Sequence, residues 1–107
     1  MSASAPHAAD YVAEIDGLLR GWALSDAERA LLRGHNESAE QQAVRLTRLR
    51  TIVGGLYLLF PENPVLRRDW VQRANAELGG HSPVQVILAD DDGLRTVARL
   101  IHAQLQQ

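Results

Sequence analysis

The sequence contains no cysteine and no lysine, and only 5% of its residues are aromatic. Without cysteine the chain has no disulfide, no thiolate zinc ligand and no cysteine nucleophile, so its stability must come from packing. It also lacks an apolar run long enough to span a bilayer, and the opening MSASAPHAAD has neither the basic start nor the apolar centre of a signal peptide. We therefore expect a cytoplasmic protein with no membrane contact.

Charge of either sign is modest. Eleven arginines stand against 13 acidic residues, giving a net charge of −2, which provides no global attraction to nucleic acid. Hydrophobic residues make up 46% of the 107 residues, a length and composition typical of one compact globular domain.

Apolar residues recur at helical spacing, and no alternating stretch predicts a strand. The expected helices run from about Asp10 through Trp22, from Ser25 to Gly34, from about Ser38 to Phe60, from Asn63 onward, from Ser82 onward, and from 90–92 to Leu105. Ser25 with Glu28 forms a capping box, and the pairs Asn63-Pro64 and Ser82-Pro83 each join a capping residue to a first-turn proline. The sequence predicts an all-α, compact bundle of about six helices.

The third expected helix is apolar nearly all round in its second half, a pattern typical of a central helix surrounded by others. Gly54 and Gly55 lie inside it, and because glycine destabilises a helix interior, we expect both to permit close approach of a neighbouring helix. In the next helix we expect Leu66, Trp70 and Val71 to point inward.

Groups that could carry chemistry are sparse. The four histidines are isolated from one another, without the spacing of a helical zinc site: His7, His35, His81 and His102. His81 and Ser82 do not make a convincing base and nucleophile, since the Ser82 hydroxyl is explained as a helix cap. The aspartates at 90–92 are expected to cap and complement the start of the last helix rather than bind magnesium. We predict no enzyme, no metal and no cofactor.

Arginines are dense in the middle of the chain. Acidic residues interleave with them, which favours a solvated face with local ion pairs over a surface that reads DNA. If DNA is bound, Arg45 and Arg48 are the candidate contacts.

A longer motif spans the fourth and fifth helices. The run LYLLFPENPVLRRDWVQRANAELGGHSPVQVIL resembles the toxin-binding domain shared by the Xre, MbcA and ParS antitoxins. The resemblance rests on the order and spacing of nine residues: Leu59, Phe60, Pro61, Trp70, Asn75, Gly79, Gly80, Ser82 and Pro83. The earlier WALSDAERALL, residues 22–32, is similar to the segment that opens the family's helix-turn-helix-like region.

This resemblance implies the antitoxin of a type II toxin-antitoxin pair, which is not itself an enzyme. Its implied partner is a RES-domain toxin that depletes cellular NAD, neutralised when the antitoxin docks and blocks the active-site cleft. The implied organisation is a flexible tail at 1–9, a reduced helix-turn-helix-like region at 10–45 for dimerisation or DNA, and a toxin-binding domain at 46–107. A homodimer within a larger toxin-antitoxin complex is also expected.

The resemblance further implies which residues form the docking surface. These are Trp70, Asn75, Gly79, Gly80, Ser82 and Pro83, and we expect Arg73 and His81 beside them to contact the toxin as well. The paired glycines predict a tight turn that leaves room for a partner's backbone. On the last helix Arg95, Arg99 and His102 follow one another at spacings of four and three, and we expect this polar stripe to meet acidic groups in the toxin cleft.

One feature departs from the family's pattern. Family members with a full DNA-reading region place a recognition helix between the counterparts of Leu32 and Leu46, and only residues 33–45 lie between them here, which is too short for the usual recognition helix and linker. Toxin neutralisation is therefore favoured over operator binding. A DNA-binding autorepressor of the same family and an unrelated helical adaptor remain as alternatives.

Overall fold

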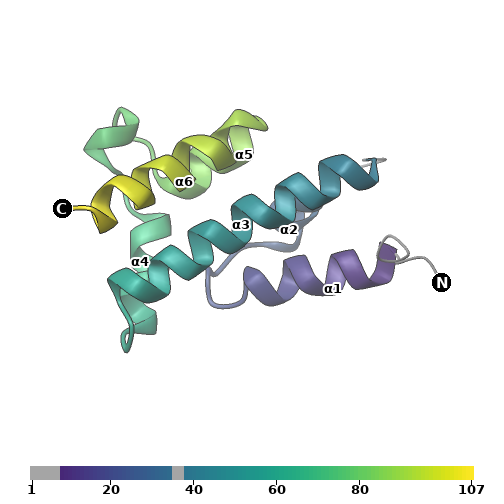
Figure 1. The fold of residues 1–107 in the computed structure, drawn as a ribbon, viewed down its shortest axis with the longest axis horizontal. Coiled ribbons are helices and arrows are strands. Elements are labelled where there is room, and N and C mark those ends of the chain that lie inside the picture. Colours follow the sequence, from purple (N-terminus) through teal and green to yellow (C-terminus); the bar gives the residue numbers. More distant parts are fainter. Residues whose placement is uncertain (1–7, 35–37) are drawn as a thin grey trace.

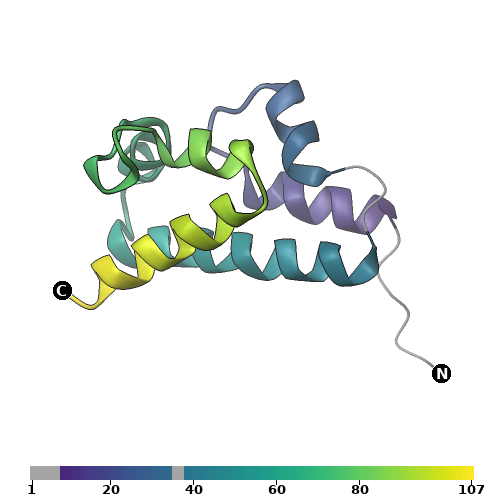
Figure 2. The ribbon, with the colours of Figure 1, turned by 90° about the horizontal axis from the view of Figure 1, so that it is seen from above.

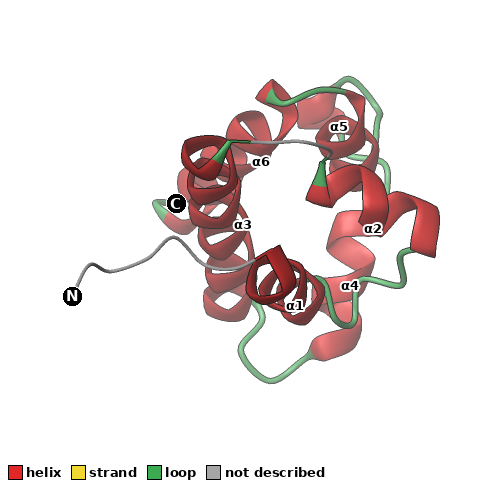
Figure 3. Ribbon diagram, turned by 90° about the vertical axis from the view of Figure 1, so that its right-hand side faces the viewer, coloured by secondary structure: helices red, strands yellow, loops and turns green. Residues whose placement is uncertain are grey.

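A computed structural model describes residues 8–34 and 38–107 as a bundle of helices (Figure 1). In chain order the elements are α1 (Ala8–Leu18), α2 (Asp26–Arg33), α3 (Ala39–Leu59), α4 (Pro64–Gln72), the single 3-10 turn η1 (Ala76–Leu78), α5 (Pro83–Ala89) and α6 (Asp92–Leu105). No strand occurs in the described ranges (Figure 3). The predicted all-α bundle of about six helices is confirmed.

Most helix starts follow the capping signals in the sequence. Ser25 and Ser82 each accept a hydrogen bond from the amide three residues later, and each forms the reciprocal capping-box bond. Ser38 does the same with Gln41 at the start of α3, and the Asn63 side chain accepts from the Leu66 amide at 3.1 Å. These bonds satisfy amides that have no partner within the helix.

Contrary to the prediction from the sequence, the three aspartates at 90–92 do not all cap α6. Asp91 immediately precedes α6, but its side chain makes no capping hydrogen bond. Asp90 lies one residue farther out, and its Oδ1 accepts from the Gly93 amide at 2.9 Å. Only this carboxylate of the run therefore caps the helix.

Helix α3 organises the core, packing against α1 on one flank and α6 on the other. Gly55 is the point of closest approach to α6, since a Cβ atom there would lie 2.2 Å from Ile101 Cγ2. Gly54 is exposed, and nothing lies within 4 Å of where its Cβ would be. The expectation of close helix approach is confirmed for Gly55 and wrong for Gly54, because adjacent residues of a helix point about 100° apart and only Gly55 faces α6.

The other helices surround α3 only in part. They cover one side of it, and Figure 2 shows no helix against the other side. Val44, Tyr57 and Leu58 are accordingly exposed. Leu66 was also expected to point inward, yet it is 41% exposed, whereas Val71 on the same helix is fully buried. The short α4 presents only a narrow strip to the core, and the strip passes through Val71.

The N-terminal helices share this core. Helix α1 begins at Ala8, so the predicted tail at 1–9 lies mostly outside the described residues. The helix ends at Leu18, before Trp22, but Trp22 is still buried in the core. The Gln72 Nε2 atom donates to the Trp22 carbonyl at 2.6 Å, which ties the segment after α1 to α4.

Among the described residues, the core contains sixteen buried apolar side chains from both halves of the chain: Tyr11, Ile15, Leu19, Trp22, Leu24, Leu32, Leu46, Leu49, Ile52, Leu56, Val71, Val84, Ile87, Leu94, Val97 and Ile101. Figure 3 shows the six labelled helices arranged in a ring when the bundle is viewed end-on. The division of the chain at residue 46 stays a prediction, and this position lies inside α3.

Candidate docking surface

The segment between α4 and α5 closes on itself, and residues 75–81 are called the glycine turn below. The Asn75 side chain accepts from the Glu77 amide at 2.9 Å. The Asn75 backbone amide donates to the His81 carbonyl at 3.0 Å, and the Asn75 carbonyl accepts from the Gly80 amide at 3.0 Å. Asn75 therefore connects both ends of the turn.

Gly79 and Gly80 supply the conformation that closes the turn. Their φ angles are +66° and +89°, a region that side chains with a Cβ rarely adopt. Both glycines are exposed, and no atom lies within 4 Å of where a Cβ would be. The predicted tight turn is confirmed, and it depends on backbone angles. Close approach of a partner's backbone stays a prediction.

Ser82 and Pro83 lie buried at the start of α5, directly after the glycine turn. The Ser82 hydroxyl accepts from the Gln85 amide at 3.1 Å. The Gln85 side chain accepts in return from the Ser82 amide at 2.9 Å. Within this chain these two residues fix where α5 starts relative to the glycine turn, while the neighbouring His81 is exposed.

Three of the predicted docking residues line one small hollow of about 170 Å³: Trp70, Arg73 and Asn75. Phe60 and Leu66 complete its apolar wall. Trp70 is half-buried and packs against the core, so the indole belongs partly to the core and partly to the surface. Sequence reasoning missed the part played by Leu66, whose exposure brings it to this hollow instead of the core.

The polar stripe on α6 is exposed along its length, as the spacing of Arg95, Arg99 and His102 predicts. Arg95 forms an ion pair with Asp92, one turn earlier. The His102 Nε2 atom lies 3.0 Å from the Gln106 Nε2 atom. No acidic side chain in the described ranges pairs with Arg99. The stripe therefore presents nitrogen groups to a partner.

The glycine turn and α6 meet at a second hollow, of about 430 Å³, which His81 lines together with Thr96. The helix pair α5 and α6 sets this geometry, since a Cβ at Gly93 would lie 1.9 Å from the Val86 carbonyl oxygen. The turn and the C-terminal part of α6 lie at the same end of the molecule (Figures 1 and 2). His81 of the glycine turn and Thr96 of α6 therefore share this hollow, whereas Arg95, Arg99 and His102 do not line it.

The two candidate DNA contacts have different surroundings. Arg45 is buried, and its guanidinium donates to the Arg33 carbonyl at 3.0 Å and to Asp91 Oδ1 at 3.1 Å. It thereby links the end of α2 to the start of α6. Arg48 is half-buried beside it. DNA contact stays a prediction, and the burial of Arg45 is unfavourable for it because the guanidinium is already used within the protein.

We also searched the described ranges for a metal site and for a membrane-spanning helix. No group of three or more histidine, aspartate or glutamate side chains there is placed to hold a metal ion. No helix there combines the length and apolar character that crossing a bilayer demands. His7 and His35 lie outside the described residues.

Comparison with known proteins gives one match. The family model of the antitoxin Xre/MbcA/ParS C-terminal toxin-binding domain matches residues 48–104. No curated protein and no solved structure matches the chain. The matched segment runs from α3 to α6 and contains the glycine turn, both hollows and the polar stripe.

Proposed function

The chain belongs to the Xre/MbcA/ParS antitoxin family and carries its toxin-binding domain, and from this we propose that it neutralises a RES-domain toxin that depletes NAD. Antitoxins of this family are not enzymes, as the sequence predicted. In the proposed complex the domain docks on the toxin and blocks the active-site cleft. The match over residues 48–104 is the observation that carries the proposal.

The proposed docking surface has three parts. The glycine turn offers a stretch of backbone with two exposed glycines. The hollow beside Trp70 and Arg73 accepts an apolar group. The polar stripe supplies two guanidinium groups and an imidazole that donate to acidic groups of the toxin cleft. The buried Ser82 and Pro83 fix the position of the turn relative to α5.

The proposal is tested by co-expression with the product of the neighbouring gene, followed by affinity purification and measurement of cellular NAD. A stable complex and restored NAD are expected. A stable complex with NAD still depleted would contradict neutralisation, and a neighbouring-gene product that leaves NAD unchanged when expressed alone would exclude a NAD-depleting toxin as the partner. Absence of a complex would contradict neutralisation by docking.

A charge-reversal variant tests the polar stripe. We expect Arg95→Glu combined with Arg99→Glu to keep the fold, since both side chains are exposed, and to weaken toxin binding at least tenfold, or about 1.4 kcal/mol. The control is Arg29→Glu with Arg50→Glu, which changes the net charge equally. Arg29 pairs with Asp26 within α2, and Arg50 on α3 pairs with Glu14 on α1; such surface pairs contribute little to stability. Equal affinity of the two double variants for the toxin would refute the role of the stripe.

A further inference from the structure

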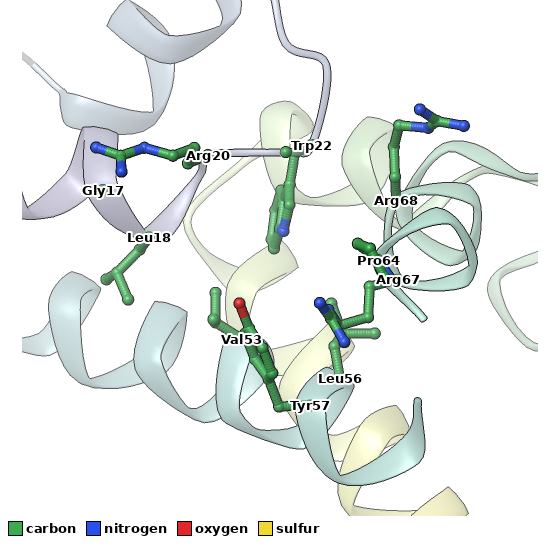
Figure 4. A pocket seen from close by; sticks show the side chains of 11 residues that line it. Gly17, Leu18, Arg20, Trp22, Val53, Leu56, Tyr57, Pro64, Arg67 and Arg68 are labelled. Carbon is green, nitrogen blue, oxygen red and sulfur yellow. The ribbon is translucent and has the colours of Figure 1, made fainter. Parts of the chain in front are cut away.

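A pocket of about 310 Å³ lies away from the proposed docking surface (Figure 4). Its walls come from the end of α1, the segment containing Trp22, the second half of α3 and the start of α4. Leu18, Val53 and Leu56 provide aliphatic surface, and the rings of Trp22 and Tyr57 provide flat aromatic surface. None of the residues proposed to meet the toxin lines this Trp22 pocket.

All ionised side chains that line the Trp22 pocket are arginines: Arg20, Arg67 and Arg68. Within the described ranges Arg20 and Arg67 pair with no carboxylate, and Arg68 has only its half-buried neighbour Asp69 at 3.5 Å, which also pairs with Arg73. In Figure 4, Arg20 and Arg68 extend away from the indole, whereas Arg67 lies beside Tyr57. The pocket therefore attracts anions, and Arg67 is the cation that lies against its aromatic surface.

Arg67 is held in a fixed position. Its Nη1 atom donates to the Phe60 carbonyl at 2.5 Å and to the Pro61 carbonyl at 3.4 Å. Its guanidinium carbon lies 4.0 Å from the centre of the Tyr57 ring, a cation–π arrangement. These contacts leave Nη2 and Nε for another acceptor. Because the side chain is already ordered, a ligand that pairs with it loses little free energy to ordering.

The remaining polar atoms of the pocket also favour an acceptor. Trp22 is only 4% exposed, and no described residue accepts a hydrogen bond from its Nε1 atom. Indole nitrogen is a donor only. Figure 4 shows the indole facing Tyr57 and Arg67 across the pocket. A ligand seated there meets donors at one side and apolar walls at the other.

We propose that the Trp22 pocket binds a small organic carboxylate with a flat, apolar body, such as a one-ring aromatic acid. Its carboxylate pairs with Arg67, and its ring lies among Trp22, Tyr57 and Leu56. The volume is at the lower end of the range of small-molecule sites, about 300–1,000 Å³, which suits one ring. The apolar walls disfavour inorganic phosphate, which has no surface to bury. This site is independent of the proposed toxin partner.

The test uses the full chain and follows the two indole N–H resonances by NMR during titration with phenylacetate. The Trp70→Phe variant assigns the Trp22 signal. We expect a saturable shift of the Trp22 resonance, and at least tenfold weaker binding of phenylacetamide, which has the same ring without the charge. Equal binding of the acid and the amide, no saturable shift, or an equal shift with inorganic phosphate alone would overturn the proposal.

Matched variants locate the site. Arg67→Gln is expected to weaken phenylacetate binding at least tenfold, whereas Arg50→Gln, exposed on α3 outside the pocket, should have no effect. Gly17 lines the pocket, and no atom lies within 4 Å of where its Cβ would be. Gly17→Glu and Gly17→Gln therefore add similar bulk, and the Glu variant should bind phenylacetate at least tenfold more weakly than the Gln variant. Equal binding within this pair would overturn the proposal even if Arg67→Gln does not fold.

Discussion

Adjacent glycines in α3 should respond differently to the same substitution. Gly54→Ala adds a methyl group in open space, so the better helix propensity of alanine should stabilise the protein by about 1 kcal/mol. Gly55→Ala gains the same propensity but places its Cβ 2.2 Å from Ile101 Cγ2. Isoleucine is stiff at its branched Cβ, and forced overpacking costs about 1–3 kcal/mol. The free energies of unfolding of the two variants should therefore differ by about 1–3 kcal/mol.

Urea unfolding followed by circular dichroism measures this difference, provided that both variants unfold in one transition with the same slope. A double-mutant cycle identifies the clash as its cause. Ile101→Leu keeps the side-chain volume but has no methyl group on Cβ, so Gly55→Ala in that background should stabilise by about 1 kcal/mol, as Gly54→Ala does. Equal effects of the two glycine substitutions in the wild-type chain would refute the packing of α3 against α6 described above.

Three further substitutions test the docking region. Gly93→Ala places its Cβ against the Val86 carbonyl oxygen, which cannot move without shifting α5, so thermal unfolding should show a loss of about 3 kcal/mol or more. Ser82→Ala removes a helix cap and leaves the Gln85 amide without its acceptor; a loss of about 1 kcal/mol is expected in urea, and an unchanged midpoint would contradict the cap. Trp70→Ala should cost about 1–3 kcal/mol, because the indole is only half-buried, and weaken toxin binding at least tenfold; undiminished affinity would remove Trp70 from the surface.

The arrangement of the core bears on how the family domain works in this chain. The matched segment begins inside α3, yet α1 and α2 contribute Tyr11, Ile15 and Leu32 to the same core. Arg45 links these helices to the start of α6 by hydrogen bonds to Arg33 and Asp91. Unfolding of the N-terminal helices should therefore expose core residues of the toxin-binding domain, so the two regions are expected to unfold together.

Local signals allowed much of the fold to be predicted. Capping boxes and first-turn prolines act within three or four residues. Ser25, Asn63 and Ser82 therefore predict helix starts independently of the rest of the chain. Gly79 and Gly80 predict a turn in the same way, because glycine adopts a positive φ angle at little cost wherever it stands in the chain. The polar stripe also follows from helical periodicity alone.

By itself the sequence determined the number and type of elements, the tight turn and the family, because these depend on local backbone preference and on the order of residues along the chain. Only the tertiary structure decided which glycine of α3 meets α6, that Leu66 reaches the surface and that Arg45 is buried. It alone brought the segment after α1 against α4 to form the Trp22 pocket. These outcomes depend on the angle and depth at which helices cross, and those are set by contacts between side chains distant in sequence.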